Sequence, residues 1–172
     1  QPLRSLVNKL KRGVPFSDIK DIPQTAYLTS SEDVSAHILP GDINLFSHEE
    51  CLLDKQKQAK NFKHIEEESN KMEASRIIQR VDNESIVVNP PFPPMTEAEL
   101  DASFDLPYTR LPHPKYKGKT ISAFDMIQFS VNLHRGCFGG CAFCTISAHQ
   151  GKFIASRSKD SILKEIKIIT SM

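Results

Sequence analysis

The sequence predicts an α/β fold in which an α+β segment, residues 1–125, precedes a β-loop-α unit, residues 126–172. Three observations support this prediction. Apolar residues recur at helical spacing in several windows, two β-favouring runs flank a turn sequence, and a further β-favouring run enters a glycine-rich loop that an amphipathic helix follows. Parallel strands need crossover connections, so an order of strand, loop and helix is typical of the first unit of an α/β architecture.

The N-terminal part of the chain is predicted to contain two helices separated by a strand. The apolar face of the first helix consists of Leu3, Leu6, Val7 and Leu10. Residues 22–30 form a β-rich run. Residues 45–73 are predicted to form one long helix, because Ser47 and Glu50 have the spacing of a capping box at its start.

The middle of the chain is predicted to form a hairpin and a short helix. Residues 76–91 place two β-favouring runs on either side of Asp82-Asn83, which is a turn sequence. Thr96 and Glu99 repeat the capping-box spacing and predict a helix that starts there.

The C-terminal part is predicted to contain an extended connector, a strand and a helix. Prolines punctuate the connector, residues 106–119. The strand lies within residues 124–136, around residues 127–131, and the helix covers residues 158–170 with Ser158 as its N-cap. The apolar stripe of this helix is Ile162, Leu163, Ile166 and Ile169.

The composition excludes several classes of function. Lysine and arginine number 22 and the acids 21, so no strong charge indicates nucleic acid or a membrane surface as a partner. No window approaches the roughly 20 apolar residues of a membrane span, and the N-terminus lacks the apolar core of a secretory signal, so we expect a cytoplasmic protein. The first residue is not Met, and the chain ends after one β-loop-α unit, so we expect an internal piece of a longer protein.

Three of the four cysteines lie within eight residues, in the pattern Cys137-x3-Cys141-x2-Cys144. The glycines of this segment, Gly136, Gly139 and Gly140, allow the backbone to fold closely around a bound group. Cysteine thiolates at such spacings hold iron–sulfur clusters. A cubane has four irons, so three cysteines leave one iron open to a small molecule that carries an amine and a carboxylate.

This cysteine pattern resembles the signature of the radical S-adenosylmethionine (radical SAM) enzymes, Cys-x3-Cys-x-aromatic-Cys, with Phe143 at the aromatic position. Further segments resemble the YgiQ-like subgroup of that family, and the resemblance extends over nearly the whole chain. These segments are residues 21–28, 85–94, 99–114, 130–144 and 149–158. The resemblance implies an upstream domain similar to cobalamin-binding domains and a downstream partial TIM-type barrel. This chain would be an internal fragment that joins them and includes the first β-loop-α unit of the barrel.

The resemblance also implies the cofactors and the reaction. Cys137, Cys141 and Cys144 would ligate a [4Fe-4S] cluster, and Phe143 would lie near bound S-adenosylmethionine. An electron donor would reduce the cluster, and reductive cleavage would give methionine and a 5′-deoxyadenosyl radical that takes hydrogen from an unknown substrate. The full-length protein is therefore expected to be an enzyme, and this fragment alone to be inactive. Arg135 and Lys152 are candidates to stabilise the negative cluster.

Two other interpretations of the cysteines and their neighbours remain open. The first is a structural zinc site completed by His134 or His149, because zinc takes four nitrogen or sulfur ligands. The second is a non-catalytic scaffold segment in which residues 1–125 bridge domains. Cys51, which is separate from the cluster in the sequence, is expected to pack as a small buried hydrophobe.

Two further expectations concern the C-terminal part of the chain. Arg157 could meet an anion near the start of the following helix or could be an ordinary surface arginine. The last strand and helix are predicted to have apolar surface that would pack against barrel neighbours, so the fragment is expected to self-associate through residues 126–172 or to have a flexible end.

Overall fold

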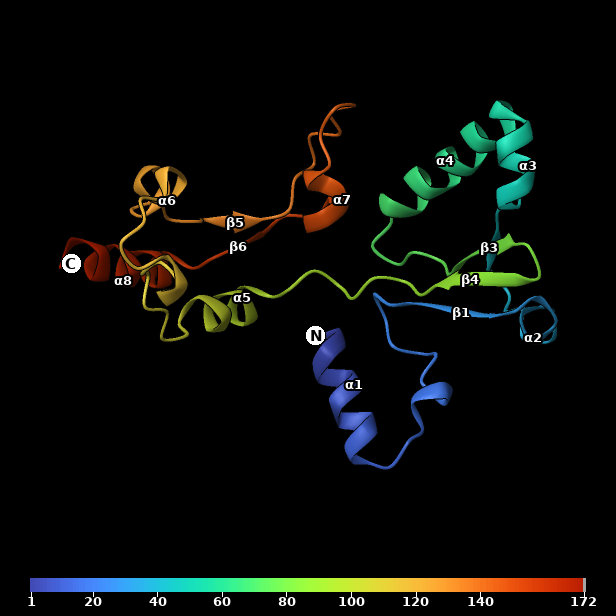
Figure 1. The fold of residues 1–172 in the computed structure, drawn as a ribbon, viewed down its shortest axis with the longest axis horizontal. Helices are drawn as coiled ribbons and strands as arrows, with labels where there is room; N and C mark the ends of the chain where they lie inside the picture. The colour runs from blue at the N-terminus through green and yellow to red at the C-terminus, as the bar shows by residue number, and fades with distance from the viewer. Residues whose placement is uncertain (172) are drawn as a thin grey trace. The chain divides into compact units, whose positions relative to one another are not determined.

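A computed structural model of the chain shows two compact units, Gln1–Pro93 and Pro94–Met172 (Figure 1). The structure describes residues 1–171, apart from the side chain of Ala148. The sequence predicts a boundary between residues 125 and 126, where an inter-domain segment would meet a barrel. The division into compact units does not test that boundary, which stays a prediction. The mixed α/β class is confirmed.

The first unit is built on a four-stranded sheet in the order β1-β4-β3-β2. Its elements are α1 (Pro2–Lys11), η1 (Phe16–Asp18), β1 (Ala26–Ser30), α2 (Ser31–Ala36), β2 (Ile43–Asn44), α3 (His48–Leu53), α4 (Lys55–Ser69), β3 (Ile77–Val81) and β4 (Glu84–Val88). Strand β4 pairs antiparallel with both β1 and β3, whereas β2 pairs parallel with β3. The predicted first helix and first strand are both present.

The predicted hairpin is confirmed, with Val81 opposite Glu84 across the two-residue turn. Asp82 adopts a positive φ of 52°, which Asp tolerates better than most residues. Ile78 and Val87 face each other in the register and are almost fully buried. Their cross-strand contact forms the centre of the core of this unit.

The single long helix predicted over residues 45–73 is wrong, because the chain breaks at Asp54 into α3 and α4. Asp54 has an extended backbone, and its side chain accepts a hydrogen bond from the Gln56 amide at 2.8 Å, so it caps α4 instead of continuing α3. The predicted capping box of Ser47 and Glu50 is confirmed at the start of α3.

The second unit contains α5 (Glu97–Phe104), η2 (Pro114–Tyr116), α6 (Ser122–Ile127), β5 (His134–Arg135), α7 (Ile146–Gln150), β6 (Ala155–Ser156) and α8 (Lys159–Thr170). The capping box of Thr96 and Glu99 begins α5, and Ser158 caps α8, as predicted. Leu100 of α5 is 2% exposed and lies at the centre of this unit.

The strand predicted around residues 127–131 is wrong. Helix α6 ends at Ile127, the Gln128 and Ser130 amides bond to carbonyls three or four residues earlier, and the strand β5 begins only at His134. A strand needs a neighbour for its backbone groups, whereas a helical turn satisfies them locally. Strand β5 pairs antiparallel with β6. That this part of the chain forms the first unit of a partial TIM-type barrel stays a prediction.

None of the helices within the described residues has the length and apolar character needed to cross a membrane.

Candidate metal centre

The three clustered cysteines lie on one loop, residues 137–151, which we call the cysteine loop. The Cys137 amide donates a hydrogen bond to the Gly151 carbonyl oxygen at 2.9 Å and closes the loop. Outside this bond, β5 pairs with β6, and the Arg157 amide donates to the Leu133 carbonyl oxygen at 2.9 Å. We call the paired segments 132–137 and 151–157 the loop base.

Gly136 is required where the loop leaves β5. It is buried, and its φ is +101°, a conformation that residues with a side chain rarely adopt. A Cβ at this position would lie 2.2 Å from the backbone oxygen of Phe153, closer than any real contact. The two sides of the loop base therefore approach each other at a point that only glycine permits.

A second glycine leaves space beside two of the sulfurs. A Cβ on Gly139 would lie 3.3 Å from the Cys137 Sγ and 3.6 Å from the Cys141 Sγ, so a side chain there would crowd the first sulfur and contact the second. The Gly139 amide also points to the Cys137 sulfur at 3.4 Å. The Cys144 amide donates to the Cys141 carbonyl oxygen at 3.0 Å, which holds the third cysteine one turn from the second.

The loop faces solvent, and its thiols are free. Cys141 is exposed, and Cys137 and Cys144 are half-buried. Phe138 and Phe143 are 81% and 91% exposed, so neither ring supports the packing of the loop. Within the described residues, no three His, Cys, Asp or Glu side chains are gathered tightly enough to hold a single metal ion.

The other residues considered from the sequence lie near the loop, with one exception. Arg135 and His134 form β5, Lys152 follows the closing residue of the loop, and His149 lies on α7 within it. Cys51 belongs to the first unit. It is half-buried, and its sulfur lies 3.0 Å from the Asn61 amide nitrogen, so it makes a polar contact as well as packing.

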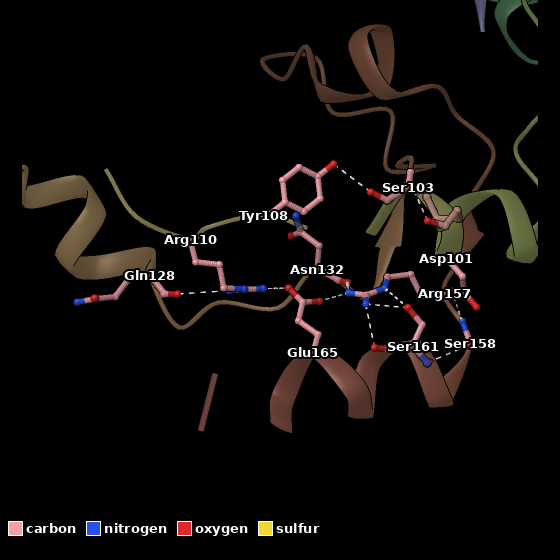
Figure 2. Close-up of polar contacts among 11 residues, drawn as sticks. Asp101, Ser103, Tyr108, Arg110, Gln128, Asn132, Arg157, Ser158, Ser161 and Glu165 are labelled. Atoms are coloured by element: carbon pink, nitrogen blue, oxygen red, sulfur yellow. Dashed lines mark hydrogen bonds and ion pairs between the residues drawn. The ribbon is translucent and has the colours of Figure 1, made fainter. Parts of the chain in front are cut away.

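Arg157 is neither a surface arginine nor an open anion site, because only 1% of its side chain is exposed. Its Nη1 donates to the Asn132 carbonyl oxygen at 3.0 Å and pairs with Glu165 of α8 (Figure 2). Its Nη2 donates to the Ser161 hydroxyl at 2.8 Å and to the Ser161 carbonyl oxygen at 3.0 Å. Its guanidinium carbon lies 4.2 Å from the centroid of the Phe104 ring. The sequence gives no signal for the contacts with Asn132 and Phe104, which are distant from Arg157 along the chain.

Two further contacts extend this network to the start of the unit (Figure 2). Arg110 pairs with the other carboxylate oxygen of Glu165, so Glu165 forms ion pairs with both Arg110 and Arg157. Asp101 of α5 accepts a hydrogen bond from the Ser158 amide at 3.0 Å. Hydrogen bonds from Ser158, with the nearby Arg157 charge, lower the pKa of Asp101 and keep it ionised.

The first unit carries a pocket of about 780 Å³ that the sequence did not predict. Arg76 and Asp42 form part of its wall, and their side chains are 16% and 3% exposed. Arg76 donates to both carboxylate oxygens of Asp42, at 3.0 and 2.5 Å, and to the His37 carbonyl oxygen at 2.8 Å. Arg76 and Asp42 thus satisfy each other's hydrogen bonds and form a closed part of the pocket wall.

A glycine-rich loop of three free cysteines, with an aromatic residue before the third, on an α/β chain is the arrangement of radical SAM proteins. The family described as Radical SAM N-terminal matches residues 1–130, and the chain belongs to this family. Its relatives are UPF0313 proteins, which are the YgiQ-like radical SAM family.

Three of these relatives illustrate the similarity. The UPF0313 protein of Bacteroides thetaiotaomicron is 61% identical over 183 residues, covering 100% of this chain and 29% of the relative. That of Porphyromonas gingivalis is 62% identical, covering 99% of this chain and 27% of the relative. That of Methanocella arvoryzae is 45% identical, covering 97% of this chain and 27% of the relative. The chain thus spans less than a third of the length of these relatives. No solved structure matches it.

Proposed function

We propose that this chain forms part of a radical SAM enzyme, in which Cys137, Cys141 and Cys144 ligate a [4Fe-4S] cluster and Phe143 lies beside S-adenosylmethionine. The bound cluster would supply one electron for reductive cleavage of S-adenosylmethionine to methionine and a 5′-deoxyadenosyl radical, which takes hydrogen from a substrate. Family membership supports the class of protein, and the cysteine spacing supports the ligands.

The observation that carries this proposal is the space beside Gly139. The sulfurs of Cys137 and Cys141 lie 3.3 and 3.6 Å from the position that a Cβ on Gly139 would occupy, so the two thiols lie on the same side of this glycine. A side chain at this position would contact both sulfurs, and glycine keeps that side of the two thiols uncovered. Free thiols on a short glycine-rich loop are the donor chemistry of iron–sulfur clusters.

The remaining residues of the loop would stabilise and position this group. A cluster held by three thiolates is negatively charged, so backbone amides such as that of Gly139 and the cations of Arg135 and Lys152 would stabilise it. The ring of Phe143 is exposed and free to contact a ligand. A reducible cluster and unpaired thiols suit a reducing compartment, so we place the enzyme in the cytoplasm, with a soluble electron donor as its partner.

Anaerobic reconstitution of the full-length protein with iron and sulfide tests this proposal. We expect about four irons per chain, an electron paramagnetic resonance (EPR) signal of the reduced cluster that changes when S-adenosylmethionine is added, and formation of 5′-deoxyadenosine. Phe143→Ala should weaken the change in the signal and leave the iron content unaltered. Phe138→Ala is the matched control, because Phe138 is a similarly exposed ring of the same loop.

The same experiment separates the enzyme from the structural alternatives. One zinc ion per chain, with no cluster after reconstitution, would favour a structural zinc site. A cluster whose EPR signal does not change when S-adenosylmethionine is added would favour a scaffold role for the segment.

A further inference from the structure

The side chain of Arg157 connects the cysteine loop to two helices. Its backbone amide bonds to Leu133 and its guanidinium to the Asn132 carbonyl oxygen, so it binds the segment that enters the loop. Arg157 itself ends the segment that leaves the loop. One residue thus joins both sides of the loop base (Figure 2).

The far side of the guanidinium is held by α5 and α8. Ser161 and Glu165 of α8 accept its hydrogen bonds, and the Phe104 ring of α5 covers its face. Every donor direction of the planar group is thereby used inside the protein. Such a buried fork fixes orientation as well as distance. The loop base is therefore tied to the helices at one defined angle.

We propose that Arg157 is a positioning residue for the cysteine ligands: by fixing the loop base to α5 and α8, it holds the two ends of the cysteine loop so that the three thiols can gather around the cluster. This inference rests on the proposed function, since it concerns the same cluster. Groups that orient metal ligands from outside the ligand set affect metal retention, and Arg157 acts on the cysteines through the backbone of the loop base.

A lysine cannot replace Arg157 in this role. An ammonium group has no planar fork, so it cannot reach Asn132, Ser161 and Glu165 together. Arg157→Lys keeps the charge and should still loosen the loop base. Arg157→Met removes the charge, and Ser161→Ala removes the hydroxyl acceptor while the arginine stays. Lys159→Met is the matched control, because Lys159 is an exposed cation at the start of the same helix.

Two measurements on the full-length protein test the inference. In the cluster-free protein, amide hydrogen exchange of the loop base should be faster in Arg157→Lys and Arg157→Met, and unchanged at β3 and β4. In the reconstituted protein, both variants should lose iron to a chelator about 10- to 100-fold faster and show an altered EPR signal. Ser161→Ala should show a smaller change in the same direction, and Lys159→Met none.

The possible results separate this inference from the proposed function. A wild-type protein that assembles no cluster overturns both. A wild-type protein that assembles the cluster, while Arg157→Lys and Arg157→Met match it in exchange and in iron release, overturns the positioning role alone. If Arg157→Met does not fold, Arg157→Lys and Ser161→Ala decide, and wild-type exchange of the loop base in both overturns the role.

Discussion

The Cys137 amide donates its hydrogen bond to the Gly151 carbonyl oxygen at 2.9 Å, one residue after the tight approach of Gly136 to Phe153. The bond and the close approach together bring the two ends of the cysteine loop to one place. The first ligand therefore leaves the loop base at a point where the backbone has little freedom.

Gly136→Ala is expected to open the loop base. The added Cβ would meet the Phe153 oxygen at 2.2 Å and would also sit on an unfavourable positive φ. We expect destabilisation well above the roughly 1 kcal/mol of a simple glycine-to-alanine strain, together with loss of most reconstituted iron. Urea denaturation and iron analysis measure the two effects.

Gly118→Ala is the matched control for that prediction. Gly118 has a φ of +76°, with open space where a Cβ would lie, so its substitution carries the strain of positive φ without a clash. Equal losses of stability and iron in the two variants would show that the close approach to Phe153 is unimportant.

Replacing any one of Cys137, Cys141 and Cys144 by alanine should abolish assembly of the cluster in the full-length protein. Each thiolate is one third of the proposed protein ligands, and its loss leaves a second iron open to solvent. Cys51→Ala should keep the iron content of the wild type, because Cys51 belongs to the other unit and its sulfur contacts Asn61. Iron and sulfide per chain are the measurements. Loss of iron in Cys51→Ala would contradict the ligand assignment.

Acid should weaken the first unit through Asp42. Burial acts to raise the pKa of this carboxyl group, but hydrogen bonds from Arg76 and the Leu39 amide, with the Arg76 charge, hold it below its ordinary value. Because its pKa is lower in the folded state, Asp42 contributes stability above about pH 4. That contribution is lost as the pH falls through the lowered pKa.

Asp42→Asn should therefore cost about 1.5 to 3 kcal/mol near neutral pH, since it removes the carboxylate that accepts two hydrogen bonds from the half-buried Arg76. The difference from the wild type should shrink below about pH 4. Denaturation curves over this pH range provide the test. Asp33→Asn serves as a control, because the Asp33 pair with Lys20 is exposed and should contribute at most about 1 kcal/mol. A constant difference between Asp42→Asn and the wild type across the range would refute this account.

The elements that the sequence predicted well are held by local contacts. The hairpin depends on two residues of turn, and the caps of Ser47 and Thr96 reach only three residues along the chain. The helix break at Asp54 was missed because an aspartate can either sit within a helix or cap the next one, and the sequence pattern did not separate these possibilities.

The features that the sequence did not predict depend on distant partners. Residues 127–131 were assigned to a strand from their composition, yet strand formation needs a neighbour that composition does not specify. The spacing of the cysteines was visible, but the contacts of Arg157 with Phe104 and Asn132 join elements far apart in the sequence. Only the folded chain brings these residues together.

The last prediction is that the 172-residue chain self-associates through its second unit. Apolar side chains of α6 and α8, and of the turn after α6, are largely exposed, among them Met126 (83%), Ile127 (62%), Phe129 (63%), Leu163 (42%), Ile166 (40%) and Ile168 (50%). Burying such a side chain is worth about 1.5 to 3 kcal/mol, and exposed patches of this kind favour association. The mass measured by light scattering should therefore rise with concentration.

A double variant, Met126→Ser with Ile166→Ser, should stay monomeric at concentrations where the wild type associates. The control is Leu52→Ser with Leu53→Ser, which removes two exposed leucines (72% and 90%) from the first unit and should associate as the wild type does. A monomeric wild type, or a control that also loses association, would show that the second unit does not form the contact.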